Sequence, residues 1–168
     1  MSAVDTVTAR RLARSILEAR KEGRALRPLT NTHLLTRADA LKIQDALLDL
    51  RVGLGEVLIG WYLDETGEVA PLTDRMVLPA QPIGLVEPRR VDGVAIREGA
   101  VVSAEIIIDR VVKGALPEDF LAHGCGLAGV ILGEPIVFDA GDGLVEVAAA
   151  LKARNRELLS SDLVIRLR

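Results

Sequence analysis

The run TRADALKIQDALLDLRVG at residues 36–53 decides the organisation of this chain, because helical spacing ends within it and strand-like sequence follows. Thr36 and Asp39 have the spacing of a capping box, in which each side chain accepts a hydrogen bond from the other residue's backbone N–H. Apolar residues then recur at three- and four-residue steps until Gly53, which predicts a helix over about residues 37–51.

The preceding residues predict a first helix at about residues 3–21. Ser2 and Asp5 can form another capping box, and Gly23 follows as a helix breaker. Between these signals the apolar residues recur at helical spacing, namely Leu12, Ala13, Ile16 and Leu17. Residues 1–53 are therefore predicted to form a helical pair.

Beyond Gly53 the sequence is dominated by strand-like segments. Residues 57–63 form a short apolar run, and residues 101–112 form a longer run rich in β-branched side chains. Prolines between the two runs predict loops and short edge strands, because proline has no N–H to donate to a sheet. Further elements are expected in this order: a short helix at residues 117–123, a strand at 127–138, a helix at 143–158 and a closing strand at 163–167.

These elements predict a single α+β domain, in which the helical part packs on a compact, mostly antiparallel β-body over residues 54–168. The 168 residues suffice to bury a sizeable core. Because 49% of residues are apolar but only 2% are aromatic, this core must be mainly aliphatic. A mean hydropathy of +0.29 is high for so small a chain and predicts a homo-oligomer with apolar surface in its interface.

Composition also bears on partners and location. A net charge of −3 gives no basic face for nucleic acid, and the apolar runs are too short to span a bilayer. No apolar signal segment follows Met1, and Cys125, the single cysteine, cannot form an internal disulfide. These features predict a cytoplasmic protein without nucleic acid or membrane as partner.

Three motifs occur in a characteristic order, namely Arg27-Pro28-Leu29, then ADALKIQ at residues 38–44, then Gly60-Trp61. This order resembles the amino-terminal part of the 2-oxopent-4-enoate hydratase and 4-oxalocrotonate decarboxylase group, in the fumarylacetoacetate hydrolase superfamily. The resemblance implies a β-roll body and a small 2-oxo acid substrate that is polarised on a divalent metal held by carboxylates. This chain is markedly shorter than typical members of that group.

Glu105 is the strongest candidate for a catalytic residue, because it interrupts an apolar strand-like run. Burying an isolated carboxylate in such a strand costs several kcal/mol unless the group is paired or binds a metal. The alternative is that Glu105 faces solvent from a half-exposed strand, which the alternation of side chains along a strand permits.

The resemblance can be aligned on Glu105 in two registers. In one, Ser103-Ala104-Glu105 falls on the paired glutamate ligands of the family, with Ser103 in place of the first. In the other, which we prefer, Glu105 falls on the third ligand glutamate and residues 121–133 continue the match. Either register leaves metal ligands missing, so it implies that Mg²⁺ or Mn²⁺ binds weakly, no tighter than about millimolar, or not at all.

Tyr62 is a second catalytic candidate, since it follows Gly60-Trp61 where the family has a lysine that assists proton transfer. A tyrosine can donate a hydrogen bond to an oxyanion, but with a pKa of about 10 it is a poor general base near neutral pH. Hydration by the family's usual route is therefore expected to be weak. The alternative is a structural role for Tyr62 at the edge of the core.

His123 falls on a polar position of the family's site, which implies an acid/base or substrate-binding histidine. A nucleophilic pair with Cys125 is not favoured, because the spacing does not bring thiol and imidazole together and no third residue orients them. The glycines around them, Gly124, Gly126, Gly129 and Gly133, are expected to permit close backbone packing in a β-roll.

Arg110 is placed to bind a substrate carboxylate, and the neighbouring Asp109 is the other substrate-binding candidate. Together these residues predict a divergent, hydratase- or decarboxylase-like lyase. Its substrate would be a small 2-oxo acid or another enolisable compound, including one of secondary metabolism. The alternative is a non-catalytic partner subunit or pseudoenzyme of a full-length hydratase or decarboxylase.

Overall fold

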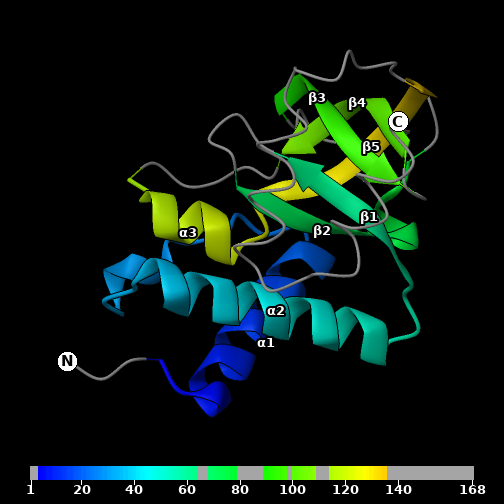
Figure 1. The fold of residues 1–168 in the computed structure, drawn as a ribbon. Helices are drawn as coiled ribbons and strands as arrows, with labels where there is room; N and C mark the ends of the chain where they lie inside the picture. Colours follow the sequence, from blue (N-terminus) through cyan, green and yellow to red (C-terminus); the bar gives the residue numbers. More distant parts are fainter. Residues whose placement is uncertain (1–3, 64–67, 79–88, 98–99, 109–113, 136–168) are drawn as a thin grey trace.

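A computed structural model describes residues 4–63, 68–78, 89–97, 100–108 and 114–135. For the strand residues 63, 89–97, 100–108 and 132–135 it describes the backbone but not the side chains. The helices are α1 (Thr6–Lys21), α2 (Arg37–Gly53) and α3 (Pro117–Ala122), with 3₁₀ turns η1 (Leu29–Asn31) and η2 (Asp74–Met76) (Figure 1). The strands are β1 (Leu58–Leu63), β2 (Val69–Thr73), β3 (Arg89–Arg97), β4 (Ala100–Ile108) and β5 (Leu127–Pro135). The predicted α+β class is confirmed.

Helix α1 begins three residues later than the capping signal at Ser2 predicts. Asp5 is itself the N-cap, and its Oδ1 accepts a hydrogen bond of 2.7 Å from the Thr8 N–H. The reason lies in the second helix, because the N–H of the buried Val4 donates to Asp39 Oδ1 at 2.9 Å. Val4 is therefore held against α2 rather than within the first turn of α1.

Helix α2 begins and ends where the sequence predicts. The capping box is present, since Thr36 Oγ1 accepts from the Asp39 N–H at 3.2 Å and Asp39 Oδ2 accepts from the Thr36 N–H at 3.1 Å. The Thr36 hydroxyl also donates to Asp39 Oδ2 at 2.7 Å, and this hydrogen bond, with those from the Thr36 and Val4 N–H groups, lowers the pKa of Asp39 against the opposing effect of burial. A single buried carboxylate thus starts α2 and attaches the segment that leads into α1.

The five strands form one antiparallel sheet in the order β2-β1-β3-β4-β5. Strand β2, which contains Pro71, lies at an edge of the sheet, as its proline predicts. Strand β3 was not predicted from the sequence. Residues 89–97, within the region expected to hold loops and short edge strands, form a nine-residue inner strand between β1 and β4. Pairing on both sides supplies what the local sequence does not signal.

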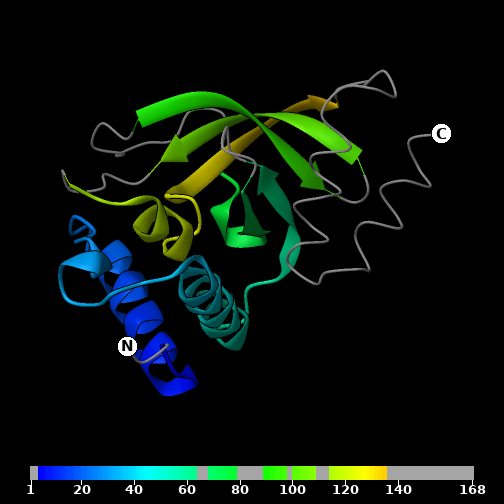
Figure 2. The ribbon, with the colours of Figure 1, turned by 60° about the vertical axis from the view of Figure 1, so that its left-hand side comes forward.

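The segment that follows edge strand β2 contacts the opposite edge strand, β5. After β2 and η2 the backbone N–H of Leu78 donates to the carbonyl of Val130 on β5 at 2.8 Å, and Val77 forms a parallel bridge with Val130. In Figure 2 the sheet is strongly curved, and the two long helices lie along one side of it. The helix expected at residues 143–158 and the strand at 163–167 fall outside the described residues, so the complete β-roll stays a prediction.

Gly129 allows this meeting of β5 with the segment after η2. A Cβ atom placed on Gly129 would lie 2.6 Å from Leu78 Cδ1 and 3.1 Å from the carbonyl oxygen of Met76. We expect Gly129→Ala to lower the free energy of unfolding by about 2 kcal/mol in urea titrations, because the Met76 oxygen is backbone and cannot rotate away. Gly53→Ala is the matched control, since a Cβ there meets nothing within 4 Å. Equal stability of the two variants would contradict this account.

The core lies between the helices and the sheet and is aliphatic, as the composition predicts. Tyr62 is the single aromatic residue of its buried cluster, and the fully buried Trp61 lies outside that cluster. The largest contributions come from the facing surfaces of α1, α2, β2 and β5, including Leu12, Ile16, Ile43, Leu47, Leu72, Leu127 and Val130. Within the described ranges, none of the helices has the length and apolar content that crossing a membrane requires.

Candidate functional site

Helix α3 is attached to the amino-terminal part through Asp119. The Asp119 carboxylate, which is fully buried, accepts hydrogen bonds from the N–H and Oγ1 of Thr30 at 3.0 and 2.6 Å and from the Leu116 N–H at 2.9 Å. Burial alone would raise the pKa of Asp119, but the hydrogen bonds from Thr30 and Leu116 lower it. Asp119 therefore stays charged and fixes where α3 begins.

The turn that follows α3 has an unusual backbone. Gly124, Cys125 and Gly126 all have positive φ values, of 75°, 55° and 69°. Cys125 is the one non-glycine residue in the described ranges with such a φ, and an L-residue adopts this region only at a cost in energy. The turn reverses the chain from α3 into β5 while every residue in it remains buried. It thereby keeps His123, at its start, in the interior.

The imidazole of His123 is fully buried, and its environment disfavours a positive charge. Burial is the main cause that lowers the pKa of His123 to about 4, and the nearby Arg20 guanidinium adds to the effect while Asp119 opposes it. Arg20, in the last turn of α1, donates from Nη2 to the His123 carbonyl at 2.5 Å. His123 is therefore neutral near physiological pH.

A small cavity lies beside His123, between α1, α2, the β2–η2 segment and the turn after α3. Its polar lining includes Arg20, Gln44, Arg51, Thr73 and His123. Its volume of about 10 Å³ is close to what one water molecule occupies.

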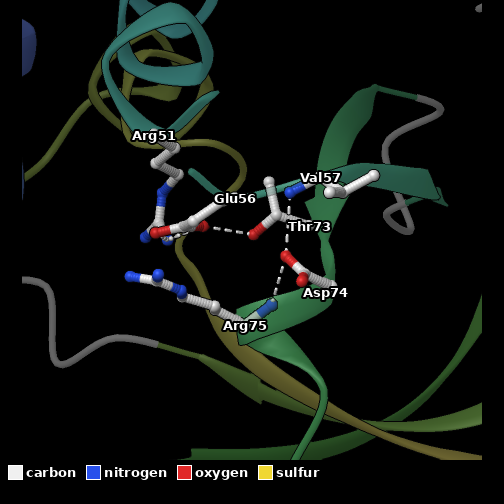
Figure 3. Close-up of polar contacts among 6 residues, drawn as sticks. All are labelled: Arg51, Glu56, Val57, Thr73, Asp74 and Arg75. Carbon is white, nitrogen blue, oxygen red and sulfur yellow. Dashed lines mark hydrogen bonds and ion pairs between the residues drawn. The ribbon is translucent and has the colours of Figure 1, made fainter. Parts of the chain in front are cut away.

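A buried ion pair borders the same cavity, and Figure 3 shows how its residues lie. Arg51 Nη1 contacts Glu56 Oε2 at 3.0 Å, and Thr73 Oγ1 donates to the same oxygen at 2.5 Å. The side chains of Arg51 and Glu56 are only 13% and 7% exposed. Through Thr73 the pair joins the end of α2 to β2. The sequence analysis missed this ion pair. A usable signal was present, because Arg51 and Glu56 lie on either side of the Gly-Leu-Gly at which α2 ends.

The predicted site residues are placed as follows. Tyr62 lies on β1, opposite Ala70 and Ala95; it is 5% exposed within the core cluster and is not among the residues that line the cavity of His123. Glu105 lies on β4, in register with Asp92 on β3 and Ile131 on β5. Asp109 and Arg110 lie outside the described residues. The catalytic and binding roles of these four residues and of His123 stay predictions.

Asp92 is an acidic neighbour of Glu105 that the sequence analysis did not consider. It is the direct register partner of Glu105, so two acidic residues occupy opposite positions on adjacent central strands. The missing signal was β3 itself, because without that strand nothing in the sequence relates positions 92 and 105.

The described side chains do not fit the metal site that the resemblance implies. Among the residues whose side chains are described, no group of three histidine, cysteine or acidic side chains could hold a metal ion. The buried carboxylates of Asp39, Glu56 and Asp119 each accept hydrogen bonds that hold the fold together. Glu105, the ligand position that the resemblance implies, is described in its backbone only, so its role as a ligand stays a prediction.

The arrangement of helices and strands also occurs in solved structures of an enzyme from the group that the sequence motifs resemble. Two solved structures of 4-oxalocrotonate decarboxylase from Pseudomonas putida G7 match it, each with a TM-score of 0.66. One is complexed with magnesium and adipate and is 17% identical over 79% of this chain; the other is complexed with calcium and acetate and is 16% identical over 79%.

This chain covers 65% and 64% of the length of those two decarboxylase chains. No protein-family model matches the sequence, and no curated protein matches it either. The likeness at this low identity establishes the fold, so the expected resemblance is confirmed at that level. Activity is a separate question.

Proposed function

We propose that this chain is a divergent lyase-type enzyme, hydratase- or decarboxylase-like, for a small 2-oxo acid or another enolisable substrate. The observation that carries the proposal is the shared fold with a decarboxylase whose solved structures hold a divalent cation together with a carboxylate compound. Glu105 on an inner strand of the sheet, with Asp92 in register beside it, supports the same reading.

The proposed roles follow from the chemistry of each side chain. Glu105 is the proton acceptor or the ligand of a weakly held Mg²⁺ or Mn²⁺, and Arg110, beside Asp109, binds the substrate carboxylate. A cation bound at Glu105 would polarise the 2-oxo group. Tyr62 is proposed to donate a hydrogen bond to the developing enolate, a charge that aligned donors stabilise strongly in a site that excludes water. Neutral His123 can accept a proton but is a weak base, because its pKa is about 4.

Glu105→Gln tests the proposal directly. We expect wild-type protein to turn over 4-oxalocrotonate, and the variant to lose at least about 100-fold in kcat, because the amide cannot accept a proton. Turnover is measured as the fall in ultraviolet absorbance when the conjugated acid is consumed. The assay is run without added metal and with Mg²⁺ or Mn²⁺ added. Glu22→Gln, an exposed glutamate on another element, is the matched control. Unchanged turnover in Glu105→Gln would contradict the assignment.

The second candidate function is a non-catalytic partner subunit of a full-length hydratase or decarboxylase. The observation in its favour is that Tyr62 is part of the aliphatic core and His123 is fully enclosed, so both have structural roles that need no reaction. Wild-type protein that turns over none of the family's substrates, yet raises the activity of a full-length enzyme on mixing, would favour this candidate. The expected homo-oligomer and cytoplasmic location stay predictions under either function.

A further inference from the structure

Two buried side chains from facing elements each present polar atoms that need a partner. Gln44, fully buried on α2, donates from Nε2 to the Leu121 carbonyl at 2.8 Å, which fixes the amide so that Oε1 is directed elsewhere. Within the described part of the chain, neither Gln44 Oε1 nor either ring nitrogen of His123 has a hydrogen-bond partner. A buried polar atom left unsatisfied costs about 1–3 kcal/mol, and native structures rarely leave one so.

Both side chains line the cavity described above. The two arginines of that cavity have other contacts. Arg20 donates to the His123 carbonyl, and Arg51 contacts the carboxylate of Glu56. Gln44 and His123 therefore determine which chemistry the cavity accepts.

The hydrogen-bonding inventory of these atoms selects the bound group. Gln44 Oε1 can only accept, so the group must donate; neutral imidazole has one donor and one acceptor nitrogen, so the group can also accept there. An anion without a proton cannot donate to Gln44, and a metal ion or ammonium could bind the acceptor nitrogen of the imidazole but could not accept from its N–H. A hydroxyl does both, and about 10 Å³ leaves room for the smallest hydroxyl compound alone.

We propose that a single buried water molecule occupies this cavity and bridges Gln44 Oε1 and the imidazole of His123. The water joins α2 to the turn between α3 and β5, beside the direct hydrogen bonds from Gln44 to the Leu121 carbonyl and from Arg20 to the His123 carbonyl.

A crystal structure at a resolution that shows ordered waters tests this directly. We expect one spherical density peak at hydrogen-bonding distance, about 2.7–3.2 Å, from both Gln44 Oε1 and a ring nitrogen of His123. His123→Phe fills the cavity and removes both nitrogens, so the peak should be lost. In oxygen-17 relaxation dispersion the number of long-lived internal waters should fall by one. His33→Phe, at the other histidine of the chain and only partly buried, is the control that should keep the count.

Three results would overturn the proposal. They are a direct hydrogen bond between Gln44 and His123, a wild-type map with no peak in the cavity, and elongated density of an organic ligand. If His123→Phe does not fold, the wild-type map alone decides, because it shows either the water or one of these three alternatives.

Discussion

The stability of this protein should fall by about 3 kcal/mol as the pH is lowered from neutral to about 4, through His123 alone. The pKa of His123 lies near 4 in the folded state and near its ordinary 6.5 in the unfolded chain. Between these values the unfolded state binds a proton that the folded state rejects. The stability contributed by neutral, buried His123 is thus fully present above about pH 6.5 and is lost as the pH falls to about 4.

The charges around His123 come from three elements, namely Arg20 on α1, Asp119 on α3 and Arg51 across the cavity on α2. Urea titrations at a series of pH values measure how the free energy of unfolding changes with pH. In wild type this free energy should fall between about pH 6.5 and 4, and in His123→Gln, whose side chain does not titrate, the fall should be absent. His33→Gln is the matched control and should keep the slope.

The acidic groups affect a different range of pH. The pKa values of Asp39 and Asp119 are lowered from 3.8, so their contribution to stability is present above that value and is lost as the pH falls below it. The part of the stability loss between about pH 6.5 and 4 that His123→Gln abolishes is therefore assigned to His123. A slope that persists unchanged in His123→Gln would show that the imidazole is not buried in the folded protein.

Glu56→Ala should lower the free energy of unfolding by about 4 kcal/mol, since it leaves the Arg51 charge buried without its partner. The variant also removes the hydrogen-bond acceptor of the Thr73 hydroxyl, and Thr73 is fully buried. Urea or thermal unfolding measures the loss.

The matched control is Glu22→Ala, which removes the partner of Arg24 from a pair whose side chains are 57% and 60% exposed. Exposed pairs of this kind contribute about 0–1 kcal/mol. The double variant Arg51→Met, Glu56→Leu should recover much of the stability, because no unpaired charge is then buried. A loss in Glu56→Ala no larger than in Glu22→Ala would contradict the buried pair.

The sequence by itself determined those elements whose signals are local. The capping box of Thr36 and Asp39 and the end of α2 at Gly53 depend on hydrogen bonds within a few residues, and the edge position of β2 follows from the missing N–H of Pro71. The motif order of the first sixty residues was enough to indicate the fold. At Glu105 the sequence indicated an unusual carboxylate and no more, because its role depends on neighbours that are remote in the chain.

Only the tertiary structure decided the features that need distant residues to meet. Strand β3 forms because β1 and β4 pair with it on both sides, and Val4 leaves α1 because Asp39, 35 residues later, accepts its N–H. Asp119 and Thr30 meet across 89 residues, and they set the position of α3 and of the turn that follows it. The pKa of His123 follows from that placement, because removal from water is a property of the packed interior and not of neighbouring residues in the sequence.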